Sequence, residues 1–591
     1  MSFVHLHVHT QYSLDSMASI EGLFDRAEEL GMPALAITDS GTLSGVKHFL
    51  NCASSHPAVK PIVGCDLGII HDDGRINLVT LLARNLTGYR HLVRIVTEAN
   101  LNDALPASVV GQAFIEKYHG GLICIASGVG DVHWYWRVFG DDFYWEVRND
   151  AGTPHDVKVV ATNDVFFVRK DDGPAYDCYR CIEADIRIDE LPEQEREHQE
   201  YLKSEEEMMA LFQTHPEALA NTLEVAAKVE RYSIEGLSGK ASIKSAELLR
   251  SMTWEGARER YGENLTKVQK ERLNVELDII CEAGYPDCFL FARDIVEAAR
   301  NLGSLVGYGR GRIVGSAVAY CLGITALDPL LYGFPFEPVL NPACPKPPLI
   351  RIDVENVAML RDIIEDKYGT DHVIRPVAFG HLLARSADRE MERIFCEMLD
   401  NSDEAKRFAR ELEGVVRAVS PHYCAVFYSR ESFSNLIPLC RVKDRFAGEK
   451  VRASQYDSQS LEEMGMIRFD ILPQRYLSVI HDCMDLIVDR HGRHIDRKKD
   501  ILEKPVDPNV LAVFCNKVSK IMVAHPIGAG EALAYYELAW FKKRFPLEYF
   551  EARLKNASYD EEREEILEEC RSLGIHLETT YKKEKYNEVT S

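Results

Sequence analysis

Residues 3–40, FVHLHVHTQYSLDSMASIEGLFDRAEELGMPALAITDS, predict the fold of the N-terminal half. The first of them, 3–8, have the apolar character of a β-strand, and residues 20–30 then repeat apolar side chains at the i, i+3, i+4, i+7 spacing of a helix. Gly31 fits as the C-cap of that helix, and a second strand is expected at 33–38. The stretch is therefore predicted to form a strand–helix–strand unit.

The same alternation continues along the chain to about residue 230. Further apolar runs of strand length lie at 61–65, 78–83, 121–127 and 157–162. Strands that alternate with helices usually pair in parallel. We therefore predict a parallel β/α barrel over residues 1–230, closed by two helices within 204–230, in a multidomain chain of mixed α/β and α+β class.

Polar side chains follow the predicted strands at or just past their C-terminal ends. They are His7, His9, Asp15, Asp39, Asp66 and Asp164. The functional sites of β/α barrels lie at that end. His7 and His9 are two residues apart in an extended segment, so both rings would project to one side, as a shared metal ion requires. A lone HxH pair is more often part of a packed core, but the whole series favours a metal site.

Composition and charge narrow the class of protein. The 591 residues are 46% hydrophobic and 27% charged, which indicates several ordinary globular domains. No run approaches the roughly 20 apolar residues of a membrane helix, and the N-terminus lacks a secretory signal pattern. Fifteen cysteines without regular spacing favour a reducing cytoplasm. A net charge of −24 lowers the expectation of strong DNA binding, although a basic groove is still compatible with it.

Five motifs of the N-terminal half resemble the polymerase-and-histidinol-phosphatase (PHP) domain of bacterial DNA polymerase III α subunits. They are HLHVHTQYSLD (5–15), LAITDSGTLSGV (35–46), KPIVGCDLG (60–68), LLARNLTGYRHLV (81–93) and VVATNDVFF (159–167). The resemblance implies a distorted β/α barrel with a cluster of His, Asp, Glu and Cys metal ligands. In some members that cluster is linked to phosphoesterase or proofreading activity.

The family's ligand set is only partly present in this chain. The matching positions hold His7, His9, Asp15 and Asp164, while Asp66 replaces a glutamate. Four further ligand positions are lost, and they hold Ser40, Asn77, Phe166 and Val129. A multinuclear site without these ligands would hold its metals poorly. We predict a structural barrel with no metal and no hydrolase activity; one residual Zn²⁺ or Mn²⁺ ion and an active phosphoesterase are the alternatives.

Residues 272–342, from RLNVELDII to FEPVLNP, resemble the start of the polymerase palm in the same family. The turn Gly309-Arg310-Gly311 lies within this match. Such a turn presents N–H groups and a guanidinium to phosphates, so the resemblance implies a former triphosphate-binding loop. The loop is altered, because Tyr308 replaces a proline and Arg312 a serine.

Polymerases of this family place three aspartates around two Mg²⁺ ions, with two of the three on one strand. Without gaps, the family's PDxDxD falls on 348–353, so Leu349 and Arg351 take the catalytic positions. Asp353 is then the accessory carboxylate. A register shifted by two would instead place Arg351 and Asp353 at the catalytic pair. The remaining catalytic aspartate is Asp470, and we predict that Arg351 pairs with Asp353 or Asp470 in an inert palm.

The resemblance divides the chain into five segments. They are a PHP domain (1–230), the first part of the palm (231–370), a thumb-like segment (371–435), a returning palm segment (436–485) and a reduced fingers remnant with a C-terminal tail (486–591). Residues 528–532 replace a lysine, serine and histidine set of the family's fingers. Compared with the family, the chain is predicted to be truncated and divergent.

Three functions are weighed on this basis. The first is a pseudo-polymerase scaffold that binds replication or repair proteins, or DNA weakly, and no membrane. The second is an active DNA-directed DNA polymerase, which would use Mg²⁺ and rebuild its site from Asp353, Glu355 and Asp470. The third is a metal-dependent phosphoesterase that acts through the barrel alone. The identity of a partner and the oligomeric state are left open.

Overall fold

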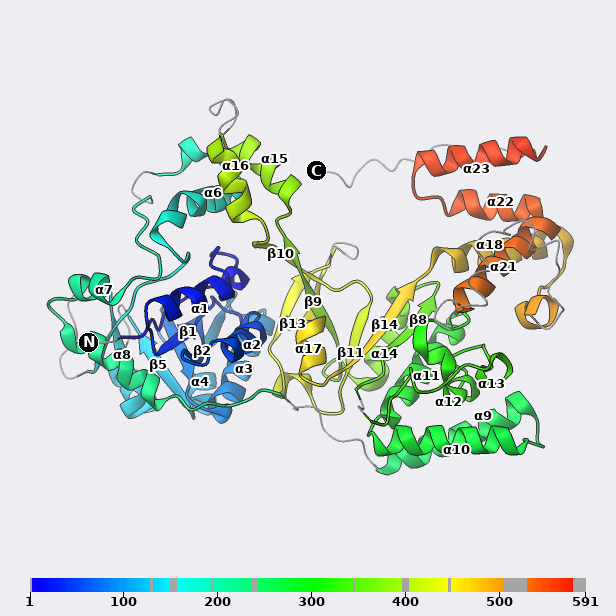
Figure 1. The fold of residues 1–591 in the computed structure, drawn as a ribbon, viewed down its shortest axis with the longest axis horizontal. Helices are drawn as coiled ribbons and strands as arrows, with labels where there is room; N and C mark the ends of the chain where they lie inside the picture. The colour runs from blue at the N-terminus through cyan, green and yellow to red at the C-terminus, as the bar shows by residue number, and fades with distance from the viewer. Residues whose placement is uncertain are drawn as a thin grey trace. The chain divides into compact units, whose positions relative to one another are not determined.

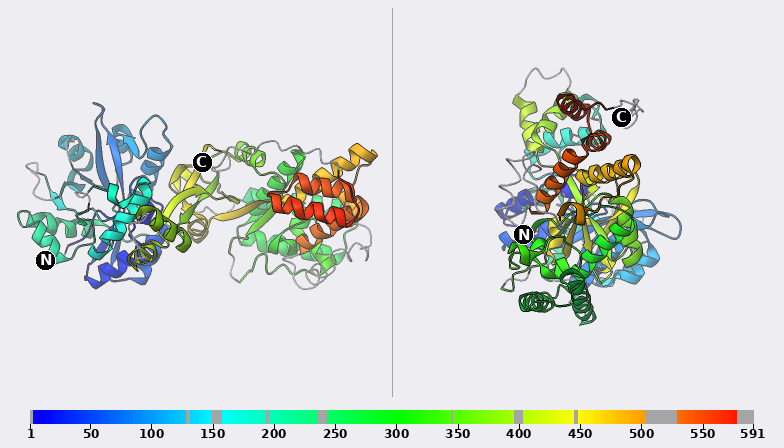
Figure 2. Two further views of the ribbon diagram at one scale, coloured as in Figure 1. Left: turned by 90° about the horizontal axis from the view of Figure 1, so that it is seen from above. Right: turned by 90° about the vertical axis from the view of Figure 1, so that its right-hand side faces the viewer.

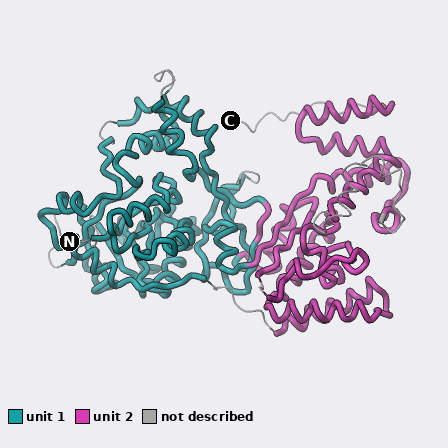
Figure 3. Tube along the Cα trace, viewed as in Figure 1, with its two compact units in different colours: residues 1–239, 371–423, 427–466 teal, residues 240–370, 424–426, 467–591 magenta. Residues whose placement is uncertain are grey.

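The computed structural model describes residues 3–127, 131–148, 157–192, 196–235, 243–343, 346–395, 403–444, 448–502 and 529–577 (Figure 1). The chain divides into two compact units (Figure 3). Unit 1 comprises residues 1–239, 371–423 and 427–466, and unit 2 comprises 240–370, 424–426 and 467–591. The five-segment division stays a prediction.

A seven-stranded sheet forms the barrel part of unit 1, in the order β1-β2-β3-β5-β6-β7 with β4 beside β2. Its strands are β1 (Ala34–Ile37), β2 (Lys60–Ile70), β3 (Ile76–Ala83), β4 (Val109–Gly111), β5 (Leu122–Ala126), β6 (Phe143–Val147) and β7 (Val159–Ala161). The strands expected at 33–38, 61–65, 78–83, 121–127 and 157–162 are confirmed as β1, β2, β3, β5 and β7. β4 and β6 were not predicted.

The barrel's helices lie between and after these strands. They are α1 (Ile20–Glu29), α2 (Val46–Ser55), α3 (Leu86–Leu101), α4 (Gln112–Tyr118), α5 (Val132–Phe139), α6 (Gly173–Ala184), α7 (Glu205–Leu211) and α8 (Pro216–Lys228). The helix predicted at 20–30 is confirmed as α1, and Gly31 follows it at φ +67°. The two closing helices are confirmed as α7 and α8. The apolar face of α8 helps to bury a core that includes Leu6, Ile123 and Tyr144.

The N-terminal segment, residues 3–9, lies between β1 and the chain just after β7. The Thr38 N–H donates to the Val8 carbonyl at 2.8 Å, and the His9 N–H donates to the Val165 carbonyl at 2.9 Å. The prediction of a regular strand at 3–8 is therefore wrong. The segment shares its hydrogen bonds between two neighbours, and only Val8 pairs as a β-bridge.

One strand contradicts the all-parallel barrel. β3 is antiparallel to β2 and to β5, whereas β1–β2, β5–β6 and β6–β7 are parallel. A tight turn at 71–75, with Gly74 at φ +82°, joins β2 to β3. A parallel pair would need a crossover of a dozen or more residues, and this connection is far too short.

A second set of strands and helices completes unit 1. The strands are β9 (Val373–His381), β10 (Val416–Pro421), β12 (Leu439–Lys443) and β13 (Lys450–Asp457), with the second half of β11 (Ala425–Tyr428), whose first half is assigned to unit 2. The helices are α15 (Ala384–Phe395), α16 (Asp403–Leu412) and α17 (Ser458–Glu463). This part packs on the barrel through buried contacts, such as the 2.6 Å hydrogen bond between the hydroxyls of Tyr89 and Tyr456.

Unit 2 contains two parallel strands, β8 (Ile350–Val354) and β14 (Ile467–Pro473). Its helices are α9 (Ile243–Tyr261), α10 (Lys267–Glu282), α11 (Pro286–Asn301), α12 (Ala317–Cys321), α13 (Pro329–Tyr332), α14 (Ala358–Tyr368), α18 (Arg475–His491), α21 (Ala529–Arg544), α22 (Pro546–Lys555) and α23 (Asp560–Ser572). α22 packs against α18 and α21 (Figure 2), around a core that includes Ile480, Trp540 and Phe550. Among the described helices, none has the length and apolarity needed to cross a bilayer.

The approach of α3 to the turn before β5 gives a test of the barrel packing. A Cβ on Gly88 would lie 1.9 Å from the Gly121 carbonyl oxygen. Gly88→Ala is therefore expected to destabilise unit 1 by roughly 1–3 kcal/mol, measured by urea unfolding followed by circular dichroism. Gly111→Ala, where a Cβ meets nothing within 4 Å, should change stability by less than about 0.5 kcal/mol. Equal effects of the two substitutions would contradict the close contact.

Candidate functional site

The barrel brings two histidines and three carboxylates together in one cluster. His7 Nε2 contacts Asp66 Oδ2, and His9 Nε2 lies 3.6 Å from the same oxygen. On the other side of the ring, His7 Nδ1 lies 2.9 Å from Glu146 Oε1 and 3.0 Å from Asp164 Oδ1. His7 thus belongs to two groups of ligand atoms that lie close enough to hold an ion: His7–His9–Asp66 and His7–Glu146–Asp164.

The donor set fits a transition-metal ion. Imidazole nitrogens with carboxylate oxygens suit Zn²⁺ or Mn²⁺, and both histidines are buried, at 4% and 3% exposure. The buried oxygen Asp15 Oδ1 makes no hydrogen bond, whereas Asp164 Oδ1 lies 3.0 Å from His7 Nδ1. Buried polar atoms normally have a partner, so Asp15 Oδ1, 3.9 Å from His9 Nδ1, indicates room for a cation. The sequence-based prediction of a barrel without any metal is therefore not favoured by this geometry.

Burial and neighbouring charges set the protonation of the two histidines. Burial opposes a proton on His7, but the Asp66 and Glu146 carboxylates beside it raise its pKa well above the usual value. Burial lowers the pKa of His9, and the charge on His7 adds to that effect. His9 is accordingly the neutral imidazole of the pair, the form that binds metals.

The guanidinium of Arg148 contacts the second of these groups, His7–Glu146–Asp164. Arg148 Nη1 donates to Asp164 Oδ2 at 2.5 Å, Arg148 Nε lies 2.9 Å from Glu146 Oε2, and Nη2 lies 3.2 Å from His7 Nδ1. Burial would raise the pKa of Glu146, but His7 and Arg148 hold it well below its usual range. Glu146 and Arg148 were missed in the sequence. Glu146 lies near the end of β6 and Arg148 directly follows it, and that strand was not predicted.

Three predicted positions lie close to the cluster without joining either group. Ser40 Oγ lies 3.3 Å from His9 Nδ1 and donates to Asp15 Oδ2 at 3.0 Å. The Phe166 ring stacks on the His9 ring, with 4.6 Å between the ring centroids. Asp39 instead accepts hydrogen bonds from the backbone and side chain of Thr10, which fixes the loop after the HxH pair.

Of the other two lost-ligand positions, Asn77 lies away from the cluster. Asn77 lies opposite Ile69 in the β2–β3 ladder, while Asp66 lies opposite Thr80. Asn77 is thus three ladder positions away from Asp66. Val129 lies outside the described residues.

In unit 2, the palm carboxylates predicted from the sequence lie on β8 and β14. Asp470 is opposite Arg351 in the parallel register, and Asp353 is opposite Leu472. Arg351 Nε donates to Asp470 Oδ2 at 3.3 Å, so the predicted ion pair is confirmed for Asp470. Arg468 Nε donates to the other oxygen, Asp470 Oδ1, at 2.7 Å. Both oxygens of this carboxylate are therefore engaged by guanidinium groups.

The glycine-rich turn lies against the other palm carboxylate. Arg310 Nε donates to Asp353 Oδ1 at 2.6 Å, and Arg310 Nη1 contacts the Glu531 carboxylate at the start of α21. Gly309, at φ +121°, and Gly530 are in direct backbone contact, because a Cβ on Gly530 would lie 1.8 Å from the Gly309 carbonyl oxygen. α21 thus covers the turn.

A second acid of α21 binds the residue before the turn. The Tyr308 hydroxyl donates to Glu537 Oε2 at 2.7 Å, and Arg497 Nε donates to Glu537 Oε1 at 2.6 Å. Glu537 is fully buried, so the three side chains form a closed internal network. The predicted loop residue Arg310 and its neighbour Tyr308 are therefore both bound to α21.

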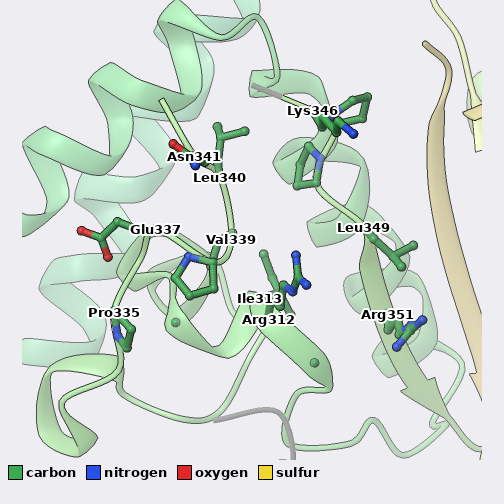
Figure 4. Close-up of a pocket in the computed structure, with 15 residues that line it drawn as sticks. Arg312, Ile313, Pro335, Glu337, Val339, Leu340, Asn341, Lys346, Leu349 and Arg351 are labelled. Carbon is green, nitrogen blue, oxygen red and sulfur yellow. The ribbon is translucent and has the colours of Figure 1, made fainter. Parts of the chain in front are cut away.

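A cavity of about 1030 Å³ opens beside the start of β8 (Figure 4). Leu349 and Arg351 line it together with Gly311, Arg312 and Lys346. The charged residues of its lining are three cations and one carboxylate: Arg312, Lys346, Arg351 and Glu337. Among the described residues, both groups with metal-ligand geometry lie in the barrel and none in this cavity.

Comparison with known proteins agrees with both parts of the chain. Residues 5–149 match the PHP domain family, and residues 247–403 and 395–473 match the family described as the bacterial DNA polymerase III alpha NTPase domain. The DNA polymerase III subunit alpha of Pseudomonas aeruginosa is 31% identical over 82% of this chain and 49% of its own. That of Campylobacter jejuni is 28% identical over 87% of this chain and 51% of its own. A solved chain from Bifidobacterium adolescentis overlaps 27% of this chain and 87% of its own at 12% identity, and its TM-score of 0.21 supports no argument.

The fold and the site define a PHP barrel followed by a bacterial polymerase III α region, which confirms the predicted mixed α/β multidomain class. The chain is a DNA polymerase III α-like protein with an N-terminal PHP domain. It spans about half the length of the curated relatives that it matches.

The convergence of His7, His9 and Asp66 predicts that the barrel binds Zn²⁺ or Mn²⁺. His9→Ala removes one ligand of this group and should weaken binding at least about tenfold, measured by calorimetric titration of the metal-free protein. His48→Ala is the matched control, because His48 is bound to Glu21 and Tyr12 instead. Unchanged affinity in His9→Ala would exclude this group as the metal site.

Proposed function

We propose that the chain is a catalytically inactive polymerase III α-like protein that serves as a scaffold in DNA replication or repair. The observation that carries the proposal is the position of Asp470 between Arg351 and Arg468. Nucleotidyl transfer in this family needs two Mg²⁺ ions about 4 Å apart, which carboxylates must bridge. Two guanidinium groups on the remaining catalytic aspartate repel such ions.

The nucleotide side of the palm supports the same function. An incoming triphosphate needs the N–H groups and the guanidinium of the glycine-rich turn. Arg310 is bound to Asp353 and Glu531, and the backbone of Gly309 is covered by Gly530. The chain's own carboxylates thus take the place of phosphate.

A rebuilt polymerase site from Asp353, Glu355 and Asp470 is the alternative. Glu355 Oε2 lies 2.7 Å from His481 Nδ1 and accepts the Leu305 N–H at 3.1 Å. Each of the three carboxylates therefore has separate partners within the protein. This arrangement favours the inert palm over the rebuilt one.

The scaffold would act on the partners of its relatives. The matched proteins are DNA polymerase III α subunits, so DNA and replication or repair proteins are the proposed partners. Weak DNA binding is the expectation, because the net charge is −24.

Phosphoester hydrolysis in the barrel is a second candidate, favoured by the two ligand groups that share His7. An ion bound there would supply Lewis-acid chemistry at a phosphate oxygen. His7, His9 and Asp66 would hold it, and Glu146 would orient the His7 ring through Nδ1. This activity is compatible with an inert palm.

Primer extension tests the inert palm. The folded protein should not extend a primed template with deoxynucleoside triphosphates in Mg²⁺ or in Mn²⁺, because no metal pair assembles at Asp470. The control is Asp470→Asn, which should behave as the wild type. Extension by the wild type that this substitution abolishes would show a working palm and refute the proposal.

A gain of metal binding provides the converse test. Leu349→Asp combined with Arg351→Asp returns two carboxylates to β8 and removes one cation from Asp470. In a His7→Ala, His9→Ala background, this variant should bind Mn²⁺ in the palm, detected by electron paramagnetic resonance. The matched control is Leu349→Asn with Arg351→Asn, which should bind none. Equal Mn²⁺ binding before and after the change would show that Arg351 is not what excludes the ion.

A further inference from the structure

The guanidinium of Arg148 contacts all three residues of the second ligand group, His7–Glu146–Asp164. Three different nitrogens of Arg148 face Asp164, Glu146 and His7, at 2.5, 2.9 and 3.2 Å. These are the same three side chains that make up the His7–Glu146–Asp164 group. A divalent ion bound at that group would lie against the guanidinium, and the two cations would repel each other.

The supporting residues fix the carboxylate side of this arrangement. Thr162 Oγ1 donates to Glu146 Oε1 at 2.7 Å, and the Glu146 side chain is only 4% exposed. Glu146 lies in β6, and Arg148 directly follows that strand. Only Val147 separates them, so the two side chains lie on the same side of the extended chain. The bidentate fork of arginine suits such a pair of carboxylates better than a lysine would.

The first ligand group, His7–His9–Asp66, has fewer contacts with cationic side chains. No arginine or lysine contact is found at His9 or at Asp66 among the described residues. Thr80 Oγ1 donates to Asp66 Oδ1 at 2.6 Å, which leaves Asp66 Oδ2 facing the two imidazoles. The carboxylates of the two groups are Asp66, Glu146 and Asp164. Arg148 offsets one of these three negative charges, which leaves less negative charge to hold a second divalent ion.

We propose that Arg148 is a built-in cation that takes the place of a second metal ion, so that the barrel holds one divalent transition-metal ion, at His7–His9–Asp66, and excludes another. A side chain of the barrel thereby limits to one ion a centre that would otherwise hold two. The proposal concerns unit 1 alone and stands or falls independently of the inert palm.

Metal stoichiometry tests the proposal on the full-length chain. Metal-free wild type, Arg148→Gln and Arg148→Lys are dialysed against Zn²⁺, and bound metal per chain is measured by inductively coupled plasma mass spectrometry. The expected values are one ion for the wild type, two for Arg148→Gln and one for Arg148→Lys, which keeps the positive charge. In the two-ion state His7 loses its ring proton to solvent and bridges the ions through both nitrogens as an imidazolate. Two ions in the wild type, none in the wild type, or one in Arg148→Gln would each overturn the proposal.

A second measurement needs only the unmodified protein, in case Arg148→Gln fails to fold. Two Mn²⁺ ions that share the His7 ring give a spin-coupled spectrum in electron paramagnetic resonance, whereas one ion gives an uncoupled six-line spectrum. With excess Mn²⁺ removed by gel filtration, the wild type should give the uncoupled spectrum. A coupled spectrum would show that Arg148 yields its position to a second ion.

Discussion

The carboxylate of Asp470 lies between two guanidinium groups, and what the palm can bind depends on this contact. Ion pairs of this kind contribute little to stability, about 0–1 kcal/mol where a partner is exposed, as Arg351 is. Their effect on a metal is larger. At equal distance, a guanidinium repels a divalent ion with twice the energy with which it attracts one carboxylate. In the proposed inert palm, Arg351 and Arg468 therefore act mainly by excluding metal from β8 and β14.

The same contact recurs at the other candidate ligands of the chain. Arg310 holds Asp353 and Glu531 in unit 2, and Arg148 holds Glu146 and Asp164 in unit 1. In each place an arginine gives the carboxylates a cation that needs no cofactor. The units differ in one respect, because no arginine or lysine contacts His9 or Asp66 among the described residues of the barrel. Unit 1 thus retains a place for an ion, and unit 2 has none among the described residues.

Much of this could be predicted from the sequence, since local patterns carry it. The 3.6-residue spacing after Ile20 predicts α1, and the motif HLHVH places His7 and His9 on one side of an extended segment. The loss of a carboxylate at Arg351 follows from the resemblance, because the family's PDxDxD motif falls on residues 348–353. Each of these signals lies within a dozen residues, where spacing alone fixes which side chains share a face.

What could not be predicted depends on contacts between distant segments. β6 is a short apolar run without periodicity, so Glu146 and Arg148 had no signal that distinguishes them from a core strand end. The reversal of β3 depends on the turn at 71–75. The cover over Gly309 depends on a helix that begins 220 residues later along the chain, at Ala529.

Anomalous diffraction from crystals soaked in Mn²⁺ and a deoxynucleoside triphosphate would test the exclusion of metal from the palm most directly. An anomalous peak is predicted at His7, His9 and Asp66 in the barrel, with none within bonding distance of Asp470 or Asp353. A peak at Asp470, with Arg351 displaced from it, would contradict the exclusion and restore a metal-dependent palm.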